Sequence, residues 1–204
     1  LLESMVMAGE PLVFANRASP YARPAAFVGI DNRRAGAQIA TLFLERGFRD
    51  VLVIHGALTS SATQDRVEGF VAAFRAAGGG PYHMAGGPAV DHLELGYRRM
   101  NARIAETGSL PDAVFCLSDL IAYGAMRALR ECRLPGAADC LLVGFDDGPL
   151  NDWLAPDLTS VRVPYEEFGP AILSALASVW SGRFDVSLVL GHRLIERGPP
   201  PHDA

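Results

Sequence analysis

Short apolar runs alternate with longer amphipathic segments along most of this chain. Most of the runs have four to six residues and are apolar at successive positions, which is typical of strands buried on both faces of a parallel sheet. We expect strands at Leu12–Ala15, Ala26–Ile30, Val51–Ile54, Ala113–Leu117, Leu141–Phe145, Ser160–Val163 and Leu188–Leu190, the last with an alternative end at Ile195.

The segments between these runs have the spacing of amphipathic helices. A glycine follows most of them, which is the signal of a left-handed residue at a helix end. Repeated strand–helix–strand units predict an α/β fold with right-handed connections. The predicted helices are Arg34–Arg46, Gln64–Ala77, Leu93–Thr107, Asp119–Glu131 and Glu166–Trp180.

Composition narrows the class of protein. Half of the 204 residues are apolar and a fifth are charged, so the chain can bury the core of one large domain or two lobes. No apolar run approaches the ~20 residues of a membrane span. The net charge is −5 and no Lys/Arg cluster exceeds two residues, so these residues alone are not expected to hold DNA.

The three cysteines indicate the redox environment. Cys116, Cys132 and Cys140 lack CxxC spacing, which disfavours a zinc site or a disulfide framework and fits a reducing, cytoplasmic compartment.

Polar residues follow several of the predicted strands. Asp31–Asn32, Ser118–Asp119 and Asp146–Asp147 come directly after strands, and Arg66 lies just inside a following helix. The carboxyl ends of strands in an open α/β sheet form a ligand-binding edge, so these side chains could line one pocket. Asp, Asn and Ser before a helix are also ordinary N-caps, and this alternative stays open; Asp119 in particular is expected to be a cap.

Motifs for nucleotide binding and covalent catalysis are missing from the sequence. There is no GxGxxG or GxxxxGK[ST] loop and no GxSxG elbow, and the five histidines are scattered. We therefore expect no cofactor and no metal site. An enzyme using Asp31, Asp146 and Arg66 as acid/base groups is a remote alternative, which turnover of a bound sugar would identify.

Several segments together carry a recognisable pattern. They are Val13-Phe-Ala-Asn-Arg17, Val28-Gly-Ile-Asp-Asn32 with Ala35-Gly36, Leu44-Glu-Arg-Gly-Phe48, Arg66-Val-Glu-Gly-Phe70, Pro111-Asp-Ala-Val-Phe-Cys-Leu-Ser-Asp119 with Ala122-Tyr-Gly-Ala-Met126, Val143-Gly-Phe-Asp-Asp147, Pro156-Asp-Leu-Thr-Ser-Val-Arg162 with Gly169, and Leu194-Ile-Glu-Arg197. In their order and spacing over nearly the whole chain, these segments resemble the LacI/GalR family of transcription regulators.

The resemblance implies a sensing module of the type I periplasmic-binding-protein fold. Such a module has two α/β lobes with parallel sheets flanked by helices, and three crossings between the lobes. We assign residues 1–48 and 158–186 to a partial N-lobe, residues 49–157 and 187–198 to the C-lobe, and residues 199–204 to a frayed tail. The family's first N-lobe elements and its helix-turn-helix DNA-binding headpiece have no counterpart, so we expect the molecule to be longer than this chain.

The resemblance also implies a set of effector contacts. Asp31, Arg66, Ser118 and Asp146 fall on positions that contact effector in the family. The loop before the second predicted helix contributes Ser60 and Ala62. Tyr165 falls where an aromatic residue can line the cleft, or can simply pack at a helix start.

One position departs from the family pattern. Where an aromatic ring often stacks on the ligand, this chain has Asp91, or His92 if the loop slips by one residue. Loss of the ring disfavours a flat purine or a pyranose face. We expect a polyol, a smaller sugar or an amine-bearing ligand.

The expected mechanism is lobe closure around an effector. Closure would bias a homodimer whose absent headpieces bind a two-fold operator, as in a repressor. Apolar residues of Leu120–Met126 and Pro149–Leu154, including Trp153, could form the C-lobe dimer contact or belong to the core. The main alternative is a periplasmic sugar-binding receptor of an ABC transporter, which shares the fold.

Overall fold

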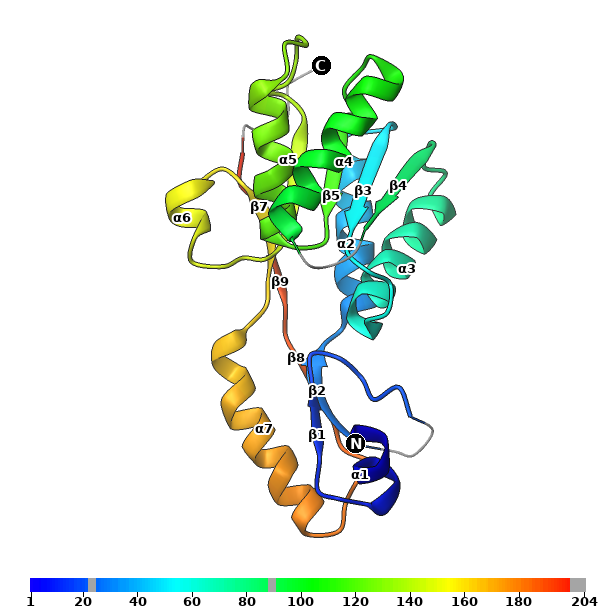
Figure 1. Ribbon diagram of the computed structural model, residues 1–204, viewed down its shortest axis with the longest axis vertical. Coiled ribbons are helices and arrows are strands. Elements are labelled where there is room, and N and C mark those ends of the chain that lie inside the picture. Colours follow the sequence, from blue (N-terminus) through cyan, green and yellow to red (C-terminus); the bar gives the residue numbers. More distant parts are fainter. Residues whose placement is uncertain (22–24, 88–90, 199–204) are drawn as a thin grey trace.

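The chain folds into two lobes, one above the other in Figure 1, each built on its own β-sheet. The computed structural model describes residues 1–21, 25–87 and 91–198. The tail predicted at 199–204 lies outside the described residues. Parallel strands flanked by helices confirm the predicted α/β class. No helix in the described ranges is long and apolar enough to cross a membrane.

The large lobe contains a six-stranded sheet. Adjacent strands of this sheet are parallel except for β7 and β9, which are antiparallel. The spatial order of the strands is β4 (Tyr82–Gly86), β3 (Val51–His55), β5 (Ala113–Cys116), β6 (Leu141–Asp146), β7 (Thr159–Arg162) and β9 (Arg193–Ile195).

Two helix pairs cover the two faces of this sheet (Figure 1). The first pair is α2 (Asn32–Glu45) and α3 (Ser61–Ala76), and the second is α4 (His92–Thr107) and α5 (Asp119–Glu131). Alternate residues of each strand face opposite helix pairs, because side chains in a strand alternate in direction. Thus Val53 packs in one core with Phe70, while Ile54 packs in the other with Met100.

Glycines let the helices of each pair approach closely. A Cβ at Gly36 would lie 2.1 Å from the carbonyl oxygen of Arg66, and one at Gly69 would lie 2.0 Å from that of Arg33. Gly96 and Gly124 make the same reciprocal contact between α4 and α5. The first contact sets the backbone of Arg66 directly against α2.

The smaller lobe holds three parallel strands in the order β1 (Val13–Ala15), β2 (Ala26–Ile30) and β8 (Ser187–Leu190). Helix α7 (Tyr165–Trp180) packs against all three strands, and α1 (Leu2–Ala8) lies beside the N-terminus (Figure 1). The chain passes between the lobes after β2, after β7 and after β8, which gives the three crossings expected from the resemblance.

The predicted lobe boundaries were wrong in three places. Helix α2 and strand β7 were assigned to the N-lobe but belong to the large lobe, and β8 was assigned to the C-lobe but joins the small sheet. The crossings fall at the ends of strands, directly after Ile30, Arg162 and Leu190, whereas the prediction put them after residues 48, 157 and 186. The alternative that continued the last strand to Ile195 spans two strands, β8 and β9, which belong to different sheets.

Candidate functional site

Arg66 is the buried centre of the site at the carboxyl edge of the large sheet. Its side chain projects from α3, and the residue is only 7% exposed. Its Nε donates to Asn32 Oδ1 at 2.8 Å and its Nη1 donates to the Leu117 carbonyl oxygen at 3.1 Å. The guanidinium carbon lies 3.5 Å from the centre of the Phe145 ring. Contacts from α2, from the end of β5 and from β6 therefore fix its position.

The electrostatics of Arg66 and Asp146 are coupled. Burial lowers the pKa of the Arg66 guanidinium, and the charge of Asp146 opposes this effect. Burial raises the pKa of Asp146, while the charge of Arg66 and the Tyr165 hydroxyl oppose that rise. Buried charges are costly unless they are paired or hydrogen-bonded. Each of these two buried charges is thus stabilised by the other.

Asp146 joins the two lobes through Tyr165. Asp146 ends β6 in the large lobe, whereas Tyr165 begins α7 in the smaller lobe. The Tyr165 hydroxyl donates to Asp146 Oδ1 at 2.9 Å. Burial raises the pKa of Tyr165, and the adjacent Asp146 carboxylate raises it further. The predicted contacts Arg66, Asp146 and Tyr165 are therefore close together at the junction of the lobes.

Ser118 extends the site toward α4. His92 Nδ1 lies 3.1 Å from Ser118 Oγ, whereas Asp91 caps α4 by accepting from the Glu94 amide at 3.0 Å. Of the two alternatives at this position, the structure thus brings His92 to the site and gives Asp91 a capping contact. Ser118 also caps α5 by accepting from the Ile121 amide at 3.3 Å, so the cap role predicted for Asp119 was assigned to the wrong residue.

Asp31 and Ser60 lie at helix starts around this group. Asp31 caps α2, with its Oδ1 accepting from the Arg34 amide at 2.9 Å. Ser60 is the N-cap of α3 without a side-chain capping bond, and Ala62 is buried in the first turn. The next hydroxyl, Ser61 Oγ, accepts from the Ala18 amide at 2.9 Å, which is a second contact between the lobes. The effector roles of Asp31, Ser60, Asp91 and the other predicted contacts remain predictions.

The predicted effector contacts did not include the residues that hold the site together. Asn32 and Phe145 fix Arg66, and Asp119 lies behind Ser118 as a buried acceptor. Asn32 and Phe145 are next in sequence to the predicted contacts Asp31 and Asp146, and this position was the sequence signal for them. Nothing local distinguishes Asp119, whose partners lie 29 or more residues away.

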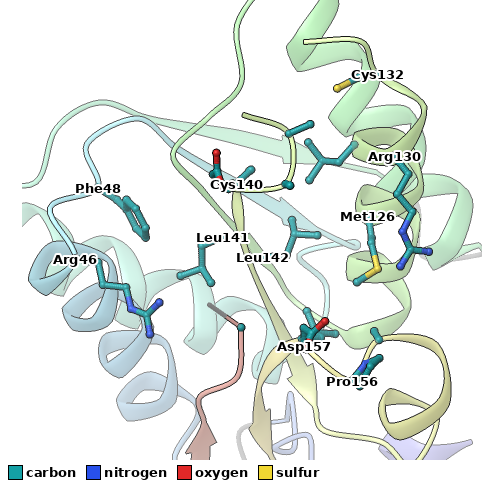
Figure 2. A pocket seen from close by; sticks show the side chains of 17 residues that line it. Arg46, Phe48, Met126, Arg130, Cys132, Cys140, Leu141, Leu142, Pro156 and Asp157 are labelled. Carbon is teal, nitrogen blue, oxygen red and sulfur yellow. The ribbon is translucent and has the colours of Figure 1, made fainter. Parts of the chain in front are cut away.

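A cavity of about 710 Å³ lies elsewhere, at the amino end of β6. Figure 2 shows Phe48, Leu141, Leu142 and Met126 around it, with Arg46 and Arg130 among the charged groups. None of the predicted effector contacts lines this cavity. Its wall includes the first residue of β6, whereas Asp146 is the last. Within the described ranges, no group of three or more His, Cys, Asp and Glu side chains could hold a metal ion.

Comparison with known proteins identifies the class. Residues 40–198 match the family model of the periplasmic binding protein-like domain, so the chain belongs to that family. It is 32% identical over 156 residues to the HTH-type transcriptional repressor PurR of Actinobacillus pleuropneumoniae serotype 3. That match covers 72% of this chain but 44% of the relative, so the chain spans less than half of the relative's length.

Solved structures narrow the class further. A LacI-family regulatory protein from Chloroflexus aggregans superposes with a TM-score of 0.84 at 27% identity, covering 97% of this chain and 71% of that one. The Cra transcriptional dual regulator from Pseudomonas putida, solved with fructose 1-phosphate, gives a TM-score of 0.80 at 25% identity, covering 96% and 72%. The chain is an effector-binding domain of the LacI family of transcription regulators.

Proposed function

We propose that this domain senses a small hydroxyl-rich molecule, a sugar or polyol, in the cleft between its lobes. The observation that supports this most directly is the convergence of Arg66, Asp146 and Tyr165 from three elements of two lobes. A guanidinium fork and a carboxylate suit vicinal hydroxyls, which can accept from one and donate to the other. Nη2 of Arg66 has no hydrogen bond among the described residues and is available for such a contact.

The function of the whole protein follows from this proposal. A ligand that contacts both lobes favours one relative arrangement of them, because only differential affinity can shift a conformational equilibrium. In a homodimer, that shift would change the spacing of DNA-binding headpieces supplied by another domain. We therefore propose a cytoplasmic repressor without enzymatic activity, since the relatives found are transcription regulators.

A phosphorylated sugar is a second candidate ligand. Arg17, two residues after β1 of the smaller lobe, acts electrostatically on Arg66 and lowers its pKa. A phosphate group would relieve the repulsion between these two cations. The Pseudomonas putida regulator was solved with such a ligand.

A thermal-shift screen tests the proposal. A bound ligand raises the unfolding temperature by mass action, so a hit identifies itself in the screen. The panel contains hexoses, pentoses, polyols, purines and fructose 1-phosphate. Arg66→Ala should abolish the shift that the best compound produces. Arg75→Ala is the matched control, since Arg75 is an exposed arginine of the same helix. Equal affinity in Arg66→Ala and wild type, measured by titration calorimetry, would refute the assignment.

A further inference from the structure

Residues Gly144–Gly148, here called the linking segment, lie between the junction of the lobes and Asp119 of the large lobe. On the side of the lobe junction, the Phe145 ring lies against Arg66 and Asp146 accepts from Tyr165. On the other side, the Gly148 amide donates to Asp119 Oδ2 at 2.9 Å. A Cβ at Gly144 would lie 2.3 Å from Asp119 Oδ1, so only glycine leaves room for that carboxylate. Within five residues, the linking segment therefore contacts Arg66 and Tyr165 on one side and Asp119 on the other.

The backbone of the linking segment is strained. Asp146 has φ 109° and Asp147 has φ 49°, in the left-handed region that non-glycine residues rarely adopt. Such a conformation is energetically unfavourable and persists only where the surroundings impose it. Ion pairs of Asp147 with Arg197 at 2.6 Å and Arg162 at 2.9 Å supply part of that restraint. Arg162 is the last residue before the second crossing between the lobes.

Asp119 connects the linking segment to α6 (Asn151–Leu154). Its carboxylate accepts from Ser160 Oγ at 2.6 Å and from Asn151 Nδ2 at 3.0 Å, in addition to Gly148. Asn151 is 1% exposed and also donates to Asp147 Oδ1 at 3.2 Å. Its Oδ1 accepts from the Tyr123 hydroxyl at 2.7 Å. The side-chain amide of Asn151 thus anchors α6 to the carboxylates of Asp119 and Asp147.

Helix α6 carries an exposed apolar surface. Trp153 is 85% exposed, Leu154 is 54% exposed and Leu150, which precedes the helix, is 51% exposed. A helix of four residues has little stability of its own, so its position is set by its anchor. Movement of the Asn151 anchor would therefore move Trp153 and its neighbours.

We propose that the linking segment transmits the state of the cleft to the apolar surface of α6. The contact between Tyr165 and Asp146 holds the segment in one strained arrangement, and a ligand hydroxyl that replaces Tyr165 on Asp146 favours another. Asp147, Asp119 and Asn151 then act as positioning residues that carry the change to α6. This inference rests on the proposed function, because it assigns a route for regulation from the same cleft.

The coupling can be measured without an identified ligand. The chain has two tryptophans, so Trp180→Phe leaves Trp153 as the only fluorescent reporter of that type. In this background, Tyr165→Phe removes the hydroxyl that reaches Asp146. Tyr97→Phe is the matched control, because the Tyr97 hydroxyl donates to the Glu131 carboxylate at 2.6 Å, away from the linking segment. The readout is acrylamide quenching of Trp153 in the full chain, at a protein concentration at which sedimentation gives the same oligomeric state for every variant.

Tyr165→Phe is expected to shift the equilibrium between α6 positions by about fivefold or more, the usual size of coupling between sites, and so to change the quenching constant. Tyr97→Phe should not change it. Asp147→Asn should abolish the response to Tyr165→Phe; Arg162→Gln, at an exposed arginine, serves if Asp147→Asn does not fold.

Two results would overturn the inference: quenching of Trp153 that is unchanged by Tyr165→Phe, or a response that persists in full without the Asp147 contacts. Circular dichroism establishes that each variant is folded, and Tyr165 is half-exposed, so loss of its hydroxyl should be tolerated. The quenching experiment uses no ligand, so its failure would refute the proposed coupling without refuting the proposed ligand site. A thermal-shift screen without hits would likewise leave the quenching result intact.

Discussion

At the level of single residues, Asp119 shows how burial and hydrogen bonding compete. It accepts three hydrogen bonds, each of which favours the charged carboxylate. Burial nevertheless raises the pKa of Asp119 to about 6 from its ordinary 3.8, helped by the nearby charge of Asp146. The folded chain therefore binds this proton more tightly than the unfolded chain does.

This difference predicts a pH dependence of stability. Because the folded pKa is the higher one, the contribution of Asp119 is fully present below pH 3.8 and is lost as pH rises through about 6. A rise from 3.8 to about 6 corresponds to about 3 kcal/mol. Urea unfolding from pH 4 to pH 7 should show the wild type losing up to this much relative to Asp119→Asn. Asp157→Asn, at an exposed position, controls for loss of a carboxylate, and parallel curves for wild type and Asp119→Asn would contradict the prediction.

At the level of elements, the site depends on how closely α2 and α3 pack. Asn32 begins α2 and bonds Arg66 of α3, so the spacing of the two helices sets the geometry of that contact. Gly36 and Gly69 permit the spacing, because a side chain at either would overlap a backbone carbonyl of the other helix. Helix packing and the proposed effector site are therefore linked through these two glycines.

Gly36→Ala should lower the free energy of unfolding by about 1–3 kcal/mol through overpacking. It should also weaken ligand binding, because Arg66 shifts relative to Asn32. Gly169→Ala is the matched control: nothing lies within 4 Å of a Cβ there, so it should stabilise α7 by about 0.5–1 kcal/mol. Urea unfolding should show that Gly36→Ala lowers the free energy of unfolding and that Gly169→Ala raises it. Equal effects of the two substitutions would contradict a role for the close approach of α2 and α3.

Periodicity in the sequence predicted the main helices well. The predicted range of α5 agrees with the structure at both ends, and the other four agree within three residues. Strand β4 was not predicted, because Tyr82–Gly86 is an edge strand with partly exposed side chains and no apolar run. Helix α6 has only four residues, which is too short for a periodic signal. The Asp119 contacts could not be predicted because they join residues far apart in the chain.

At the level of the whole molecule, α5 and α6 present the surface that we assign to self-association. Leu120 is 43% exposed and Trp153 is 85% exposed, and both lie in segments expected from sequence to form a dimer contact. Exposed apolar side chains gathered in one region are typical of interaction sites. The large lobe would then supply both the effector site and the dimer contact.

Trp153→Ser should shift the full chain toward monomer, because exposed aromatic anchors contribute most to such contacts, about 2 kcal/mol or more each. Trp180→Ser is the control, since Trp180 is 70% exposed at the end of α7 in the other lobe. Sedimentation equilibrium of both variants decides between the two surfaces. A dimer weakened by Trp180→Ser alone would place the interface on the smaller lobe.

The central claim is that effector binds between the lobes at Arg66, Asp146 and Tyr165. Hydrogen–deuterium exchange with and without the best compound from the screen tests it most directly. The amides of the linking segment and of the first turn of α7 should be protected together, because the two segments lie in different lobes and meet at the contact between Tyr165 and Asp146. Protection confined to the segments around Phe48 and Leu141, which line the 710 Å³ cavity, would contradict the claim.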